Sequence, residues 1–304
     1  MKTIRNAAGI KGISRSIVTL GNFDGIHIGH QRLLGRLAKR AKAQGCPSVV
    51  YTFEPHPLKV VAPHKSPLLI VDIADKEAII GSLGADYLVF ARFTQEFAST
   101  HPREFVEKVL VKGLRAKEVW VGAGFSFGRQ RSGTVEYLKT LGKEFNFKVF
   151  AAGPYKKGGK VVSSSRVREL IKGGDVKGAA SLLGRNYIMK GKVARGRAIG
   201  KAIGFPTANL KIMSELVPAD GVYAAYALVN GKRRNAVVNV GTAPTFGKRE
   251  RAVEAHILGF KNNIYNKKIA LSFIKRLRDE KRFSSKEALA RQIKKDIEKA
   301  ERLF

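Results

Sequence analysis

Two histidines, His27 and His30, lie three residues apart in the stretch GNFDGIHIGH at residues 21–30. The apolar run at 16–20 predicts a buried strand before this stretch, and a helix is expected to begin near the histidines. A spacing of three then brings both imidazoles to the same side of the helix. Backbone N–H groups of the glycine-rich turn and of the helix start would face an anion. We therefore predict that this stretch binds a triphosphate, where charge develops during nucleotidyl transfer.

Two alternatives remain open for the histidine pair. A zinc site would need a third and a fourth ligand, and no obvious pair of cysteines or histidines supplies them, because Cys46 is the only cysteine. The other alternative is a pair of structural histidines with no ligand.

A second polar cluster, VSSSRVR, occupies residues 162–168. Serine hydroxyls and a fork-shaped guanidinium together suit phosphate oxygens, which favours a phosphate-binding role. The alternative is that the serines only cap a helix.

A glycine-rich run, GKVARGRAIGKAIGFPTANL, occupies residues 191–210. It differs from a Walker A loop in its spacing, and Ala202 stands where that loop needs a hydroxyl for magnesium. Its glycines permit a close backbone approach to phosphates, and we predict phosphate contacts from Gly196, Gly200 and Gly204. Thr207 and Asn209 offer neutral oxygens, which suit an Mg²⁺ ion held mostly by substrate and water. The alternative is a plain loop that enters a strand.

GNFDGIHIGH resembles the HxGH signature of the nucleotidylyltransferases, and the longer stretch GNFDGIHIGHQRLL is similar to the bacterial bifunctional riboflavin kinase/FAD synthetases. VSSSRVR matches the second signature of that superfamily, which is rich in Ser and Thr and ends in arginine. The resemblance implies catalytic roles for His27, His30 and Arg168. It implies ATP contacts from Gly21, Phe23, Gly29, Ser164 and Ser165. It also implies flavin contacts from Asn22, Asp24 and, in the stretch TFEPHP, from Phe53, Pro55 and His56.

GFPTAN, at residues 204–209, is the hallmark of riboflavin kinases, and four later stretches follow their pattern: PADGVYA (218–224), NVGTAPTFG (239–247), VEAHIL (253–258) and RLRDEKRF (276–283). By this resemblance Glu254 is the base that takes the proton of the ribityl 5'-hydroxyl as it attacks the γ-phosphate. The resemblance also implies flavin contacts from Arg278 and Asp279. The alternatives are a solvent-facing strand glutamate and a surface ion pair.

The resemblance implies two reactions that both use ATP with Mg²⁺. Riboflavin is phosphorylated to FMN, and FMN is then adenylylated to FAD with release of pyrophosphate. Two positions depart from the family pattern: Gly124 stands where an acidic or amide residue is usual, and Gly259 replaces an aspartate before a loop rich in Lys and Asn. Gly124 therefore leaves a second possibility, a monofunctional riboflavin kinase whose first half is degenerate.

Alternating strands and helices predict an α/β fold for the first half, a Rossmann-like, doubly wound parallel sheet. Buried strands are expected at residues 16–20, 47–53, 85–90, 118–122 and 147–153, with amphipathic helices between them. The pattern changes near residues 183–187. We therefore divide the chain into a nucleotidylyltransferase domain at 1–184 and a riboflavin kinase domain at 185–304.

The second half is expected to form a small antiparallel β-barrel. GVYAAYALVN and KRRNAVVNVG flank a turn at Asn230-Gly231 and predict a hairpin, and KKIALSFIKRLR predicts a further strand. A C-terminal helix is expected to begin with a capping box of Ser284 and Glu287. Its apolar face would consist of Leu289, Ile293 and Ile297.

The net charge of +33 raises the alternative of a basic nucleic-acid-binding protein. Residues 1–184 hold 30 Lys and Arg against 14 Asp and Glu, and residues 185–304 hold 27 against 10, so the charge is spread evenly. We expect a solvated surface bias and no specific nucleic acid partner. No apolar run is long enough for a membrane span, and the first residues do not form a secretory signal. We expect a cytoplasmic monomer or weak homo-oligomer.

Overall fold

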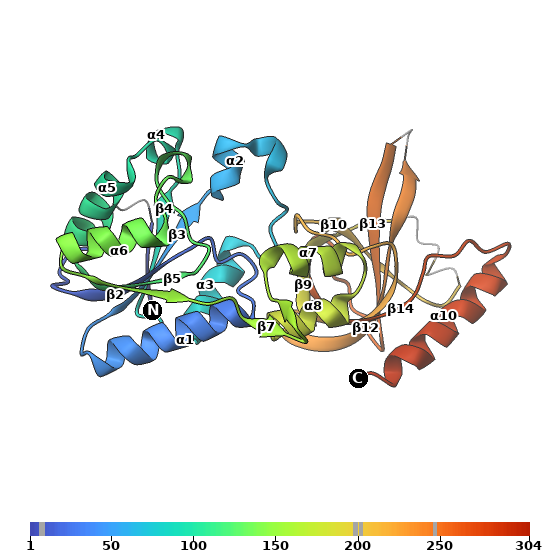
Figure 1. Cartoon of the computed structure of the whole chain (residues 1–304). Helices are drawn as coiled ribbons and strands as arrows, with labels where there is room; N and C mark the ends of the chain where they lie inside the picture. Colours follow the sequence, from blue (N-terminus) through green and yellow to red (C-terminus); the bar gives the residue numbers. More distant parts are fainter. Residues whose placement is uncertain (6–9, 197–199, 201–202, 246–247) are drawn as a thin grey trace. The chain divides into compact units, whose positions relative to one another are not determined.

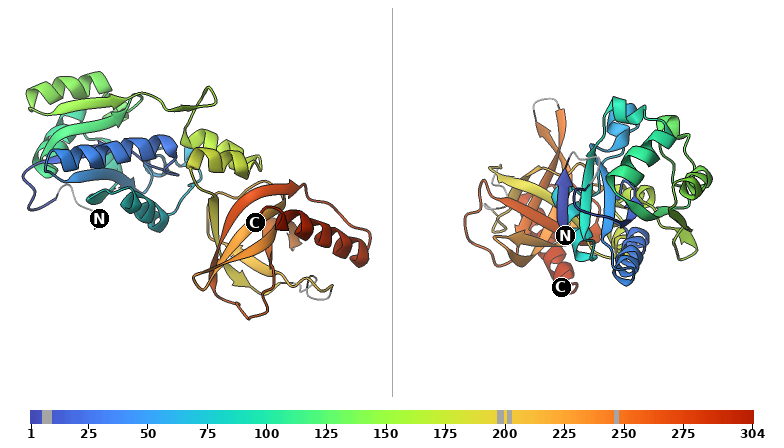
Figure 2. Two further views of the ribbon diagram at one scale, coloured as in Figure 1. Left: turned by 90° about the horizontal axis from the view of Figure 1, so that it is seen from below. Right: turned by 90° about the vertical axis from the view of Figure 1, so that its left-hand side faces the viewer.

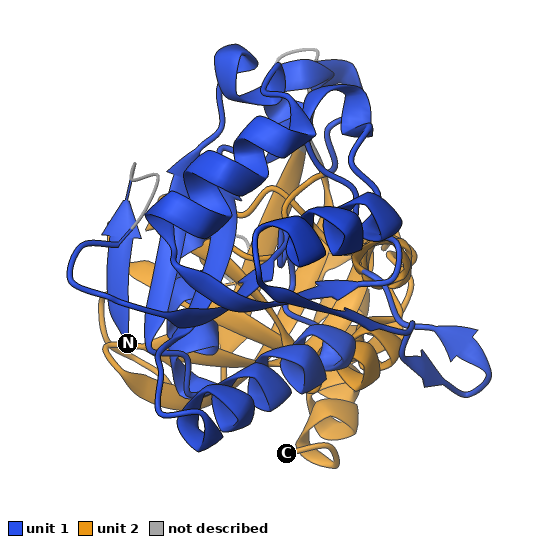
Figure 3. Ribbon diagram, turned by 60° about the vertical axis from the view of Figure 1, so that its left-hand side comes forward, with its two compact units in different colours: residues 1–67, 72–163 blue, residues 68–71, 164–304 orange. Residues whose placement is uncertain are grey.

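The computed structural model describes residues 1–5, 10–196, 200, 203–245 and 248–304, with the backbone alone at 243–245 and 248–250. These residues form two compact units, coloured separately in Figure 3. Unit 1 comprises residues 1–67 and 72–163, and unit 2 comprises residues 68–71 and 164–304. Residues 164–184 therefore make their contacts with unit 2. The division into functional domains at residue 184 stays a prediction.

Unit 1 is built on a six-stranded parallel sheet in the order β1-β4-β3-β2-β5-β6. The sheet confirms the predicted α/β, doubly wound class, and all five expected strands are present. The strands are β1 (Lys2–Arg5), β2 (Ser16–Leu20), β3 (Ser48–Glu54), β4 (Tyr87–Arg92), β5 (Ala116–Gly122) and β6 (Lys148–Ala152). The prediction that the last of these is buried was wrong, because β6 is an edge strand whose residues are all exposed or half-buried.

Helices cover both faces of the sheet of unit 1 (Figures 1 and 2). Helix α1 (Ile28–Ala43) and α3 (Ile73–Ser82) lie on one face, and α6 (Val135–Glu144) lies on the other with α5 (Pro102–Phe105) and the π-helical segment η2 (Val106–Gly113). The shorter elements are α2 (Pro57–Val61), η1 (Pro63–Lys65), α4 (Gln95–Ala98), η3 (Arg129–Arg131), β7 (Lys156–Lys157) and β8 (Lys160–Val161).

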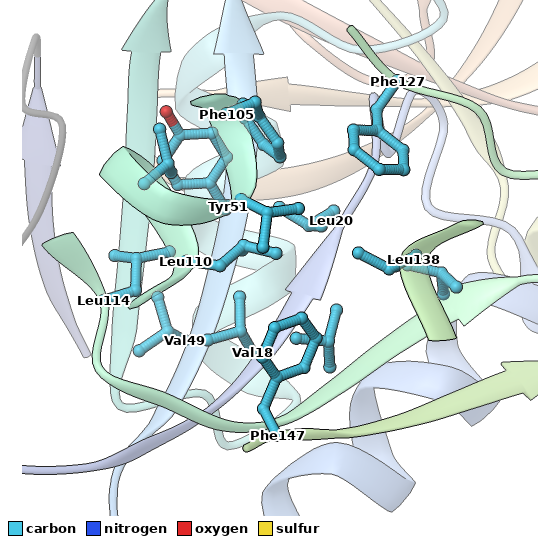
Figure 4. Packing of buried hydrophobic residues seen from close by; sticks show 14 of the residues in the cluster. Val18, Leu20, Val49, Tyr51, Phe105, Leu110, Leu114, Phe127, Leu138 and Phe147 are labelled. Carbon is cyan, nitrogen blue, oxygen red and sulfur yellow. The ribbon is translucent and has the colours of Figure 1, made fainter. Parts of the chain in front are cut away.

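The core on the η2 and α6 face is a continuous apolar cluster (Figure 4). Val18 of β2 and Val49 of β3 supply its sheet side, and Leu110 of η2 and Leu138 of α6 supply its helical side. All four side chains have no solvent exposure. Burial of this cluster holds the loops that follow the strands in place, because the loops are tethered to buried strand ends.

The main segment of unit 2 starts with α7 (Ser164–Lys172) and α8 (Val176–Leu183), which are followed by a closed barrel in the order β10-β13-β12-β11-β14-β9. All of its strand pairs are antiparallel, which confirms the predicted barrel. Its strands are β9 (Tyr187–Ala194), β10 (Ala208–Ile212), β11 (Gly221–Val229), β12 (Lys232–Thr245), β13 (Lys248–Ile257) and β14 (Lys268–Arg278).

The predicted hairpin turn is confirmed at Asn230-Gly231, where φ is 49° and 75°. Two successive positive φ values define a type I′ turn, whose twist matches that of the flanking strands.

The C-terminal helix α10 (Lys286–Glu301) is present, but its predicted cap was wrong by one residue. Ser285, and not Ser284, is the N-cap, and its side chain accepts a hydrogen bond of 3.2 Å from the backbone N–H of Ala288. The capping-box spacing selected the first of two adjacent serines, whereas the backbone becomes helical only after the second.

We predict that Leu110→Ala lowers the free energy of unfolding of unit 1 by about 2–5 kcal/mol, because it leaves a cavity in a fully buried cluster. Urea unfolding followed by the fluorescence of Trp120, the only tryptophan, reports on unit 1 because that residue lies in β5. Val161→Ala, at a side chain that is 45% exposed, is the control and should change little. Equal effects of the two substitutions would contradict the assigned core.

Candidate active sites

The first site forms at the carboxyl end of β2, the strand at which the order of the sheet reverses. β2 pairs with β3 on one side and with β5 on the other, and the chain leaves it through residues 21–27 into α1. Ligands of open parallel sheets bind at such a reversal point. The loop has positive φ at Phe23 (45°), Gly25 (75°) and Ile26 (39°), a conformation that is costly for the two residues that carry side chains.

His27 and His30 lie together, as predicted. His27 is the N-cap of α1, and its Nδ1 accepts a hydrogen bond of 3.3 Å from the backbone N–H of His30. The two rings are stacked with their centroids 3.7 Å apart, and the ring of Phe23 meets His30 edge-on at 5.2 Å. A Cβ added to Gly29 would approach the His27 ring to 3.1 Å, so this glycine permits the stacking.

Burial keeps both imidazoles neutral at physiological pH. It lowers the pKa of His27 to about 4, and burial together with the neighbouring charges of His27 and Lys76 lowers the pKa of His30 to about 3. The Nδ1 atom of His30 is buried and has no hydrogen-bond partner among the described residues. Such an atom is available to a ligand. Within the described ranges, no group of three or more His, Cys, Asp or Glu could hold a metal ion.

A cavity of about 580 Å³ adjoins this loop and contains several of the predicted residues. Gly21, Asn22, Phe53 and Gly124 line it, whereas Phe23, Asp24, Pro55 and His56 are not among its lining residues. The side chain of His56 lies against this wall, since its Nε2 is 3.2 Å from Nδ2 of Asn22. Asp24 is buried, with 3% of its surface exposed.

The cavity has an aromatic wall, of which only Phe53 was predicted from the sequence. Phe53 meets Phe93 at 5.5 Å and Phe97 at 5.9 Å between ring centroids, and Phe125 stacks on Phe127 at 5.6 Å. All five phenylalanines line the cavity. The sequence did contain a signal for this wall, because phenylalanines follow shortly after β4 and β5. Residues that follow the carboxyl ends of parallel strands face the ligand-binding edge of the sheet.

Ser164 and Ser165 begin α7, and Arg168 follows in the next turn. The guanidinium of Arg168 donates from Nε to the carbonyl oxygen of Leu68 at 2.8 Å. All three residues belong to unit 2, whereas the histidines belong to unit 1.

The second site is a cavity of about 480 Å³ in unit 2, and it brings six predicted residues together. These are Gly196, Gly200, Thr207, Asn209, Glu254 and Arg278. Gly204 and Asp279 are not among the lining residues. Asp279 is 80% exposed and forms a 3.1 Å ion pair with Arg276, whereas the alternative considered for this segment was a surface pair of Asp279 with Arg278.

Strand register places the polar groups of this cavity in one row. Glu254 of β13 is the register partner of Asn209 on β10 and of Asn239 on β12, so an amide lies on each side of the carboxylate. His256, two residues further along β13, has its Nδ1 2.8 Å from the carbonyl oxygen of Pro206 and thereby fixes the segment before β10. Asn239 was missed as a site residue because only the barrel register makes it a neighbour of Glu254.

Arg278 is held in the cavity wall by α10. Its Nη2 lies 2.8 Å from Oδ2 of Asp296, and Gln292 donates to the same carboxylate at 2.9 Å. Asp296 is 1% exposed, so this ion pair is buried. Leu289 and Ile293, on the predicted apolar face of α10, also line the cavity. The helix therefore forms one wall of the site, which its sequence did not indicate.

A parallel α/β unit with a glycine-rich loop at the reversal point, followed by a barrel with a carboxylate between two amides, is the arrangement expected of a two-unit nucleotide-dependent transferase. Comparison with family models makes this assignment specific. Residues 10–166 match the FAD synthetase model, and residues 183–304 match the riboflavin kinase model.

Related proteins match over almost the whole chain. The bifunctional riboflavin kinase/FMN adenylyltransferase of Buchnera aphidicola is 35% identical over 100% of this chain and 99% of its own length. The protein of the same name from Bacillus subtilis is 36% identical over 96% of this chain and 93% of its own. A crystal structure described as a macrolide-efflux protein from Streptococcus pneumoniae has a TM-score of 0.89 at 33% identity and covers 99% of each chain.

The chain belongs to the family of bifunctional riboflavin kinases/FMN adenylyltransferases. It phosphorylates riboflavin to FMN and adenylylates FMN to FAD, with ATP as the second substrate of both reactions. The monofunctional alternative is not favoured, since both family models match. A Cβ at Gly124 would meet nothing within 4 Å, so the departure from the family pattern leaves open space in the cavity wall. Among the described helices, none has the length and apolar character that crossing a membrane requires.

We predict that Gly196→Ala lowers kcat/KM for FMN formation at least ~10-fold, because the added Cβ would collide with the side chain of Asn209 and displace it from the row beside Glu254. FAD formation from supplied FMN should be unaffected. Chromatography of the flavin products measures both rates. Gly35→Ala, where a Cβ meets nothing within 4 Å, is the control. A wild-type rate of FMN formation by the Gly196→Ala variant would contradict the assignment of Asn209 to the active site.

The depressed histidine pKa values predict acid sensitivity of unit 1. Both groups titrate below their ordinary value of 6.5, so their stabilising contribution is present above pH 6.5 and is lost as the pH falls towards about 4 and 3. The urea midpoint, measured by Trp120 fluorescence at about pH 7.5 and about pH 5, should fall less in His30→Gln than in the wild type, because glutamine takes up no proton. His64→Gln, at an exposed histidine of the same unit, should keep the wild-type pH dependence. A pH dependence in His30→Gln equal to that of the wild type would contradict the burial argument.

Proposed function

We propose that the cavity of unit 2 is the riboflavin kinase centre and that Glu254 is its base. The observation that carries this assignment is the row of Asn209, Glu254 and Asn239 inside one cavity. Glu254 takes the proton of the ribityl 5'-hydroxyl while that oxygen attacks the γ-phosphorus of ATP. One P–O bond forms, and the bond to the bridging oxygen breaks with ADP as the leaving group.

The other residues of this cavity position the two substrates. Gly196 and Gly200 present bare backbone to the phosphates; a Cβ at Gly200 would collide with the carbonyl oxygen of Phe205, so that position has no room for a side chain. The apolar side chains of Leu289 and Ile293 offer a surface for the flavin ring, and Arg278 lies beside them. Gly204 and Asp279 do not line the cavity, so their proposed role is indirect: they shape the segments of chain to which they belong.

Mg²⁺ fits the donors of this cavity, since Thr207 and Asn209 offer neutral oxygens next to the carboxylate of Glu254. Thr207 and Asn209 would hold the ion. When bound, it would neutralise charge on the transferred and leaving phosphates.

For unit 1 we propose that ATP binds at residues 21–30 and that FMN occupies the phenylalanine-lined cavity beside them. An oxygen of the FMN phosphate attacks the α-phosphorus of ATP, and the bond to the bridging oxygen breaks to release pyrophosphate. Neutral imidazoles of His27 and His30 donate hydrogen bonds to this chain of phosphates, and the start of α1 adds N–H groups. Gly21, Phe23 and Gly29 shape the loop.

Further residues of the family signatures complete this proposal. Ser164, Ser165 and Arg168 bind ATP phosphates, and Arg168 stabilises the transition state of adenylyl transfer. Asn22, Phe53 and His56 contact the flavin, whereas Asp24 and Pro55 act by shaping the loops that carry them. We also propose that the protein is a cytoplasmic monomer or weak homo-oligomer without a specific nucleic acid partner.

We predict that Glu254→Gln lowers kcat for FMN formation by about 10²–10⁴-fold, because an amide cannot accept the hydroxyl proton. The assay is chromatography of flavins formed from riboflavin, ATP and Mg²⁺. FAD formation from supplied FMN, which we place in unit 1, should stay within twofold of wild type. Glu298→Gln, at an exposed position of α10, is the matched control. A fully active Glu254 variant would end its assignment as the base.

A further inference from the structure

Lys76 is a buried lysine next to the phosphate-binding loop, and neither the family motifs nor the sequence reasoning assigned it a role. It lies on α3 and is 7% exposed, and within the described ranges it is the only lysine that is buried. Its Nζ donates a 2.9 Å hydrogen bond to the carbonyl oxygen of Asn22. Burying an ammonium group costs several kcal/mol unless nearby groups compensate for the lost hydration.

The fold alone does not require a charge at this position. The hydroxyl of Thr52 already donates to the same carbonyl oxygen of Asn22 at 3.2 Å, so this acceptor has a neutral donor without Lys76. An apolar side chain in place of the ammonium would remove the desolvation cost. The positive charge therefore serves something other than satisfying the carbonyl.

Ionisable groups from three elements face the ammonium. Asp24 comes from the phosphate-binding loop, Glu54 from the end of β3 and His30 from α1, with His27 stacked on His30. Burial lowers the pKa of Lys76, and the charges of Asp24 and Glu54 raise it. In turn, the charge of Lys76 adds to the burial and to the charge of His27 in lowering the pKa of His30. The cation and the imidazole are thus electrostatically coupled.

We infer that Lys76 is a positioning residue for adenylyl transfer: its buried ammonium, 2.9 Å from the carbonyl oxygen of Asn22, places a fixed positive charge against the loop that binds the phosphates. Through Asn22 it also fixes the amide that contacts His56 at 3.2 Å. This inference rests on the proposed binding of ATP by residues 21–30.

The test replaces Lys76 by methionine, which keeps the length and the apolar stem and removes the charge. In Lys76→Met we expect kcat/KM for FAD formation from FMN and ATP to fall about 10–100-fold, while FMN formation in unit 2 stays within twofold. Lys76→Arg, which keeps both charge and donor, should restore part of the loss. Lys39→Met, at an exposed lysine of α1, is the matched control for the substitution itself.

A spectroscopic readout separates positioning from support of the fold. The ring signals of the six histidines can be titrated by NMR, and that of His30 can be assigned with His30→Gln. Removing a nearby cation makes protonation easier, so the pKa of His30 should rise in Lys76→Met and stay at the wild-type value in Lys76→Arg. An unchanged titration together with unchanged FAD formation would overturn the inference.

Two further outcomes are informative. If Trp120 fluorescence shows that Lys76→Met unfolds unit 1, the Lys76→Arg variant decides. A folded Lys76→Arg protein with the wild-type His30 titration and wild-type FAD formation supports the inference. A folded Lys76→Arg protein that has lost FAD formation while the His30 titration is unchanged overturns it. His30→Gln tests the underlying assignment separately. If His30→Gln still forms FAD at the wild-type rate, the proposed ATP site is wrong. If His30→Gln loses FAD formation while Lys76→Met forms FAD at the wild-type rate, only the inference about Lys76 is wrong.

Discussion

Hydrogen-bonded strand register is the constraint on which the proposed kinase centre depends. Glu254 alternates along β13 with Val253 and Ala255, each of which is 1% exposed and packs into the barrel. Because side chains alternate at a period of two, a slip of one residue would turn the carboxylate into this apolar interior. The same register sets Asn209 and Asn239 on either side of it. Burial of the valine and the alanine therefore fixes the orientation of the Glu254 carboxylate.

The proposed adenylyl transfer centre depends on a different balance, between burial and charge. Burial lowers the pKa of the three basic groups His27, His30 and Lys76, because the fold removes most of the water that would stabilise their charged forms. The loop before the histidines is strained, because Phe23 and Ile26 have positive φ, a conformation that residues with side chains rarely adopt. Buried β2 on one side and α1 on the other hold it there. Strain and desolvation are concentrated where the phosphates are expected to bind, which is common at catalytic sites.

Much of the fold could be predicted because it depends on local patterns. Apolar runs marked the five main strands, and Asn230-Gly231 marked a hairpin, since these two residues favour the positive φ that the turn requires. Finer features were less predictable. The burial of β6 was overestimated because a strand's place at the edge of a sheet is not encoded in its own residues. The cap of α10 lay one serine later than the pattern suggested, since adjacent serines are chemically equivalent cap residues.

The sequence by itself determined the chemistry of this protein, because its signals are local. The HxGH-type histidine pair, the GFPTAN stretch and the VEAHIL stretch with Glu254 are each short, and their residue types suit phosphate transfer. Only the tertiary structure decided which other residues stand beside them. Lys76 lies 46 positions after His30, and Asp296 lies 18 positions after Arg278, yet each pair is coupled within a buried environment. Such pairs form when strands and helices that are distant in sequence pack together, and no periodicity along the chain records them. The desolvation that lowers the pKa of His30 likewise arises only from packing.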